Sequence, residues 1–158
     1  MIEQLHEKIV KHGPSMLSIP LRYTPFIAKK YVIEQLIHWV FNKSIADGEL
    51  DFLQGHWLKI EVTDLQLNWF LTLQDGRLVV SDAQAADVIF RGSANDLILI
   101  AARKEDPDSL FFQRRLVIEG DTELGLYVKN LMDSIDLDSM PKLLRSGLQH
   151  LADFVDIQ

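Results

Sequence analysis

The 158-residue sequence contains no cysteine. This absence excludes a disulfide framework, a thiolate metal site and a cysteine nucleophile. Histidine is scarce as well: none of the five has a second histidine three or four residues away, the spacing that places two ligands on one helix face. We therefore predict no metal and no cofactor.

Long hydrophobic runs and a surplus of positive charge are also missing. Lys29, Lys30, Glu34 and Lys43 interrupt the most apolar region, so no segment reaches the roughly 18 uncharged apolar residues that a membrane span needs. Residues 1–10 mix acidic with apolar residues, which is unlike a signal peptide. The expected localisation is cytoplasmic.

The net charge of -7 disfavours nucleic acid as a partner. The charge is unevenly distributed, because residues 1–45 contain six Lys or Arg against three Glu, a balance of +3. Any peripheral attraction to an anionic membrane, such as the inner face of the plasma membrane, would come from this N-terminal part.

No group of residues predicts catalysis. Ser15 lies between Pro14 and Met16, without the flanking glycines of a nucleophile elbow. Gly120 follows an expected strand, but Glu119 and Asp121 beside it would repel a phosphate. We predict no catalytic residues, and therefore that the protein is not an enzyme.

The N-terminal third is expected to be helical but interrupted. Apolar residues at helical spacing predict a short first helix that stops at Gly13-Pro14, followed by an irregular, proline-rich connection over 13–25. A longer helix should run from Pro25 or Phe26 to about Ala46. Apolar residues cover most of its circumference, which is consistent with core packing or with a ligand or lipid surface.

From Trp57 the period changes from helical to alternating, which predicts strands at 58–62, 65–73, 77–81, 87–91 and 116–119. Asp75-Gly76 is typical of a two-residue hairpin turn. Helices are expected from a Ser93 cap, from 106 to 112, from 123 to 135 and from Pro141 onward. The order predicts an α+β fold, a mostly antiparallel five-stranded sheet covered by helices.

Two separated motifs carry a family resemblance. Residues 86–97, ADVIFRGSANDL, and residues 111–125, FFQRRLVIEGDTELG, resemble the sterol carrier protein type 2 domain. The segments GPSMLSIPLRYTPF, IAARKEDPDSLFFQRRLVIEGDTELGLYVKNLMD and LADFV further resemble the UbiT family of bacterial ubiquinone biosynthesis accessory factors from end to end.

The resemblance implies a hydrophobic tunnel between sheet and helices that binds isoprenoid quinone precursors or phospholipid. It also implies a role in oxygen-independent (anaerobic) ubiquinone biosynthesis, with UbiU- and UbiV-type iron–sulfur proteins as partners that supply the hydroxylation chemistry. The expected function is thus a non-catalytic lipid-binding accessory factor. The alternative is a scaffold for quinone-biosynthesis enzymes with a vestigial cavity.

Within this family the chain is expected to form one structural unit, with residues 1–50 as an N-terminal helical segment and residues 51–158 as the lipid-binding domain. Apolar residues of the expected sheet and of its covering helices are the candidate tunnel walls: Trp69, Leu71, Leu78, Val80, Phe90, Leu97, Ile100, Phe111, Phe112, Leu116, Ile118, Leu126, Leu131 and Met132. Each taken singly is also an ordinary core candidate.

The N-terminal segment combines cationic and apolar side chains, a composition suited to the lipid headgroup boundary. The candidate membrane-facing residues are Met16, Leu17, Leu21, Arg22, Phe26, Ile27, Lys29 and Lys30. A lid over the tunnel and a homodimer contact are the alternatives for this segment.

Overall fold

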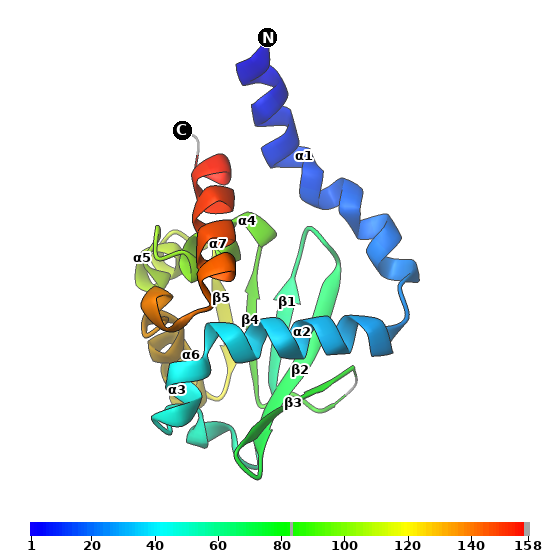
Figure 1. Cartoon of the computed structure of the whole chain (residues 1–158). Helices are drawn as coiled ribbons and strands as arrows, with labels where there is room; N and C mark the ends of the chain where they lie inside the picture. Colours follow the sequence, from blue (N-terminus) through cyan, green and yellow to red (C-terminus); the bar gives the residue numbers. More distant parts are fainter. Residues whose placement is uncertain (83, 157–158) are drawn as a thin grey trace.

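The computed structural model describes residues 1–82 and 84–156, apart from the side chains of residues 13–22. Helices precede a hairpin-rich run of strands and return after it, which gives the α+β order shown in Figure 1. In chain order the elements are α1 Ile2–Tyr23, α2 Phe26–Val40, α3 Asn42–Ala46, η1 Asp51–Leu53, β1 Leu58–Val62, β2 Leu67–Gln74, β3 Arg77–Ser81, β4 Val88–Gly92, α4 Ala94–Ala101, α5 Pro107–Phe112, β5 Val117–Gly120, α6 Thr122–Asp133, η2 Leu137–Ser139 and α7 Lys142–Val155.

The sheet has five strands in the order β3-β2-β1-β4-β5. β1 and β4 are parallel, and the other three pairings are antiparallel. In this register Ile60 of β1 lies between Trp69 of β2 and Phe90 of β4. The predicted mostly antiparallel sheet and its covering helices are confirmed.

Alternation along the strands separates an apolar face from a charged one. Leu58, Ile60 and Val62 are buried, whereas the intervening Lys59 and Glu61 are only half-buried. On the charged face Lys59 Nζ lies 2.7 Å from a Glu61 oxygen, and Arg91 of β4 also pairs with Glu61. Hydrogen bonds from Arg91, and then from Lys59, lower the pKa of Glu61 below its ordinary value.

The helices pack on the apolar face of the sheet. α2 crosses in front of the strands, and α4 and α7 lie together at one end of them (Figure 1). Side-chain caps fix the starts of three α-helices: Ser93 accepts a hydrogen bond from Asp96 N at 3.2 Å, Asp106 accepts one from Asp108 N at 3.3 Å, and Asp121 accepts one from Leu124 N at 2.9 Å. The predicted Ser93 cap is confirmed.

Two predicted helix boundaries are wrong. α1 does not stop at Gly13-Pro14 but continues to Tyr23, so the expected irregular connection is helical. A proline removes its own backbone hydrogen bond and bends a helix, yet the remaining turns can continue, and α1 changes direction along its length (Figure 1). The long second helix is instead divided at Phe41 (φ -106°, ψ 18°), whose side chain is buried in the core.

α1 extends from the body and contacts it at a few points (Figure 1). The rings of His6 and Phe154 of α7 are tilted against each other with centroids 3.9 Å apart, and Asn95 donates a hydrogen bond to the carbonyl of Val10 at 2.8 Å. None of the helices in the described ranges is both long and apolar enough to cross a bilayer.

Candidate functional site

An apolar cavity of about 620 Å³ lies between α2 and the sheet. Its floor includes the row formed by Trp69, Ile60 and Phe90 on three adjacent strands. α2 supplies one wall, and α4, α6, α7 and the ends of the strands supply the rest: Ala28, Val32, Ile33, Leu36, Ile37, Val40, Phe41, Val62, Leu65, Leu67, Ala94, Leu97, Ile98, Ile100, Ala101, Met132, Ile135 and Leu148. A volume of this size is in the usual range for small-molecule sites.

The cavity accounts for the apolar inner side of α2. Ile33, Ile37 and Val40 line the cavity and also pack against the core, and no residue of α2 is fully buried. Val32 and Leu36 line the cavity yet are 53% and 41% exposed, so they mark its mouth. α2 is also attached to the edge strand, since Glu34 Oε1 accepts a hydrogen bond from Val80 N at 3.2 Å.

Few of the described side chains that line the cavity are polar. Among these residues Thr24 and Lys29, near the start of α2, have polar or charged side chains, apart from the indole of Trp69. The Trp69 Nε1 atom is buried and has no hydrogen-bond partner. Such a lining offers no acid–base pair, but it can enclose an apolar molecule.

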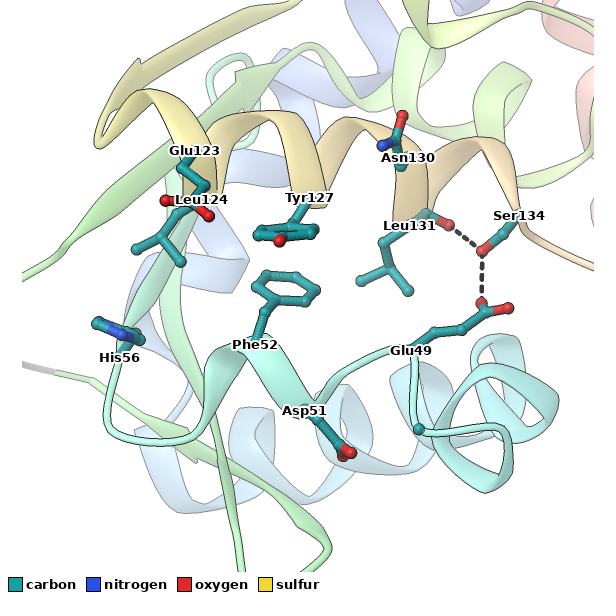
Figure 2. Close-up of a pocket in the computed structure, with 11 residues that line it drawn as sticks. Glu49, Asp51, Phe52, His56, Glu123, Leu124, Tyr127, Asn130, Leu131 and Ser134 are labelled. Carbon is teal, nitrogen blue, oxygen red and sulfur yellow. Dashed lines mark hydrogen bonds between the residues drawn. The ribbon is translucent and has the colours of Figure 1, made fainter.

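A second, more polar pocket of about 800 Å³ lies between η1 and α6. Figure 2 shows Phe52 stacked on Tyr127 across its middle, with ring centroids 5.4 Å apart. The carboxylates of Glu49, Asp51 and Glu123 line it, and Glu49 accepts a hydrogen bond from Ser134 at 3.1 Å. These charges make it a poor container for a lipid tail, although the pocket is the larger of the two.

Metal ligands are not grouped in the described part of the chain: no three His, Asp or Glu side chains there lie close enough together to hold an ion.

Residues 33–133 match the model of the SCP-2 sterol transfer family. The chain belongs to this family. Ubiquinone biosynthesis accessory factor UbiT of Escherichia coli (strain K12) is 58% identical over 156 residues, which span 99% of this chain and 90% of that protein. UbiT of Escherichia coli O157:H7 gives the same values.

A solved SCP-2 relative shares the fold. The structure described as "UbiJ-SCP2 Ubiquinone synthesis protein" aligns with a TM-score of 0.55 at 21% identity, over 69% of this chain and 97% of that one. At this identity the likeness concerns the fold alone.

The structure brings together part of the predicted tunnel wall. Trp69, Phe90, Leu97, Ile100 and Met132 line the apolar cavity. The other nine lie elsewhere: Leu71, Val80 and Leu116 are buried in the core, Leu78 and Ile118 are half-buried, Leu131 lines the polar pocket, and Phe111, Phe112 and Leu126 are exposed at the surface. A role in lipid binding stays a prediction for all fourteen.

The cavity residues that sequence reasoning missed come mainly from α2. The signal was present, since the apolar residues surround that helix, but the pattern alone does not distinguish core packing from a ligand or lipid surface. Leu148 of α7 and Leu67 of β2 were missed for a different reason. Each fits the regular apolar pattern of its element, and nothing in that pattern distinguishes a cavity wall from packed core.

The membrane-facing prediction falls partly outside the described residues. The side chains of Met16, Leu17, Leu21 and Arg22 belong to that undescribed part. Among the others, Phe26 packs against the core, Ile27 is 82% exposed, Lys29 lines the cavity, and Lys30 is half-buried with Nζ 3.8 Å from Glu34.

Proposed function

We propose that the protein is a non-catalytic lipid-binding accessory factor of ubiquinone biosynthesis, which holds a prenylated quinone precursor, or a phospholipid, and presents it to the enzymes. The observation that carries this proposal is the apolar cavity under α2. The family assignment and the name of its relatives as ubiquinone biosynthesis accessory factors support it. More specifically, the protein acts in the oxygen-independent branch of the pathway, with UbiU- and UbiV-type proteins as partners.

The energetics of the substrate explain why such a factor is useful. Each CH₂ group removed from water is worth about 0.8 kcal/mol, so a free prenylated phenol stays in the membrane or aggregates. Enclosing the tail requires apolar walls and an opening, both of which the cavity provides. The scarcity of polar groups among the described lining residues also supports a non-catalytic role.

A solubilisation assay tests the carrier function. Purified protein is mixed with a radiolabelled prenylated phenol in aqueous buffer, and aggregates are removed by centrifugation. We expect phenol to remain in the supernatant in proportion to the protein added. If the supernatant contains no more phenol than an equal mass of an unrelated acidic protein retains, the carrier function is refuted.

We further propose that residues 1–50 form a lid over the domain of residues 51–158 and that this lid contacts a membrane peripherally. The mouth of the cavity lies beside exposed apolar side chains of α2, such as Ile27 and Val32, and the half-buried Lys30 lies on the same helix. Apolar and cationic side chains together favour an anionic lipid surface.

Flotation with vesicles that contain an anionic phospholipid tests the membrane contact. We expect wild-type protein to float with the vesicles and a variant with Arg22, Lys29 and Lys30 all changed to Glu to remain at the bottom of the gradient. Equal flotation of the two proteins would rule the contact out.

The scaffold alternative has its own supporting observation. Phe112 is 80% exposed and its ring contacts that of the exposed Phe111, Leu126 of α6 is also exposed, and the acidic pocket of Figure 2 opens beside α6. Such surfaces suit protein partners. Affinity purification of quinone-biosynthesis enzymes with wild-type protein and with a Phe112→Ser variant distinguishes the two functions. A protein that retains no lipid but loses its enzyme partners in the variant is a scaffold.

A further inference from the structure

The floor of the apolar cavity contains an unpaired hydrogen-bond donor. The Nε1 atom of Trp69 is buried without a partner. One other buried side-chain atom of the described residues, Asp108 Oδ1, lacks a hydrogen bond, but Lys129 Nζ lies 2.7 Å from it as an ion pair. The indole N–H is therefore the one buried side-chain donor, among the residues described, for which the fold provides no acceptor.

Leaving such a donor unpaired is costly, and a phenylalanine at this position would avoid the cost while keeping an aromatic wall. The neighbours of Trp69 on the same face of β2, Leu67 and Leu71, are apolar. Buried unpaired polar groups in native proteins call for an explanation, and they are found where function requires them.

None of the described side chains that line the cavity accepts a hydrogen bond from the indole. These residues are apolar apart from Thr24 and Lys29, and the Thr24 hydroxyl, which could act as an acceptor, is not hydrogen-bonded to Trp69. Glu34, which lies on the same helix as Lys29, already accepts a hydrogen bond from Val80 N. An acceptor for the indole would therefore arrive with the ligand.

We propose that the Trp69 N–H donates a hydrogen bond to an oxygen at the head of the bound lipid. The cavity then selects apolar molecules that contain a phenol, quinone or ester oxygen over pure hydrocarbons. This inference rests on the lipid-binding function proposed above. α2 forms the wall opposite the sheet and has no fully buried residue. The ligand reaches the donor when this helix moves away from the sheet.

The same chemistry could come from two sources, a prenylated quinone precursor or a phospholipid ester. Three probes separate them: a benzoquinone with a short isoprenoid tail, a hydrocarbon with the same tail, and a short-chain diacyl phosphatidylglycerol. For wild-type protein we expect the oxygen-bearing ligand to bind about tenfold more tightly than the hydrocarbon. This factor corresponds to a hydrogen bond worth about 1.4 kcal/mol.

Two variants test the residue. Trp69→Phe keeps an aromatic wall and removes the donor, so we expect it to lose the tenfold preference for the oxygen-bearing ligand over the hydrocarbon. Leu36→Ala is the matched control, because it truncates the wall without changing a polar group. Leu36→Ala should lower the affinity for every ligand that binds, and by a similar factor for each.

Proton–nitrogen NMR of the wild type gives a second readout that does not depend on any variant folding. The chain contains three tryptophans, so the indole signals of Trp39 and Trp57 act as internal references. We expect the signal of the Trp69 indole proton to shift downfield when the quinone or the phospholipid binds, whichever is the ligand. The hydrocarbon should cause no such shift.

An unmoved indole proton in the presence of a bound oxygen-bearing ligand overturns the inference. So does a Trp69→Phe variant that keeps the tenfold preference or loses affinity for all ligands equally. If the hydrocarbon binds but neither oxygen-bearing probe binds more tightly, the lipid-binding function stands and the hydrogen bond is refuted. If wild type binds none of the three probes, the lipid-binding function itself fails and the hydrogen bond fails with it.

Discussion

Filling the cavity should abolish ligand binding without unfolding the protein. Ala101, at the end of α4, is half-buried and lines the cavity. In an Ala101→Phe variant the added ring would occupy space that is empty in the wild type. The new apolar contacts offset the slightly lower helix propensity of phenylalanine, so we expect the free energy of unfolding without ligand to stay within about 1 kcal/mol of the wild-type value.

The size of the effect follows from binding linkage. At a free ligand concentration of 100 times Kd, a ligand stabilises the folded state by about 2.7 kcal/mol. For a domain of this length each kcal/mol raises Tm by about 2–4 °C, so a prenylated ligand should raise the wild-type Tm by about 5–10 °C. If Ala101→Phe binds the ligand a hundredfold more weakly, the ligand stabilises the folded variant by only about 0.4 kcal/mol at the same concentration. This stabilisation corresponds to a rise in Tm of about 1 °C.

Thermal denaturation followed by circular dichroism, with and without a prenylated phenol, measures both shifts. Ala46→Phe is the matched control, since Ala46 is exposed on α3 and does not line the cavity. It should retain the wild-type shift. If Ala101→Phe folds normally and shows the same ligand-induced shift as wild type, the ligand does not occupy this cavity.

Two further predictions concern the sheet. Gly120→Ala should lower the free energy of unfolding by at least about 2 kcal/mol in urea titrations, because Gly120 has φ +103° and an added Cβ would lie 2.5 Å from the Asp87 carbonyl oxygen. Gly76→Ala, at φ +75° with no atom within 4 Å of the added Cβ, should cost less, and equal costs would contradict the clash. Because Arg91 and Lys59 lower the pKa of Glu61 in the folded state, Glu61 stabilises the fold above its ordinary pKa of 4.5, and this contribution is lost as the pH falls further. Glu61→Gln should therefore lose less stability than wild type between pH 6 and pH 3, and parallel pH profiles would refute the role of Glu61.

Most of the fold could be predicted from local patterns. The alternation from Leu58 to Val62, the Asp75-Gly76 turn and the Ser93 cap each depend on neighbours in the sequence, and all three are present in the structure. The boundaries in the N-terminal third were not predictable in this way. Local signals place a helix end at Gly13-Pro14, but α1 continues, and the break in the second helix at Phe41 depends on burial of that side chain in the core.

The candidate site was predictable only in part, because a cavity is a property of tertiary packing. Trp69 and Phe90 could be placed on the correct face of the sheet from alternation alone. Phe112 could not, since its position on a short helix after a charged turn leaves its direction open, and the structure exposes it. The contribution of α2 likewise became visible only when the helix was seen to lie over the sheet (Figure 1).

The central claim is that the cavity under α2 holds a lipid. Native mass spectrometry of protein purified from cells without detergent, followed by extraction and identification of any bound molecule, tests it most directly. We predict a lipid adduct that is present in the wild type and in Ala46→Phe and absent in Ala101→Phe. A wild-type protein that is purified empty and remains empty after incubation with a prenylated phenol and with phospholipid would contradict the claim.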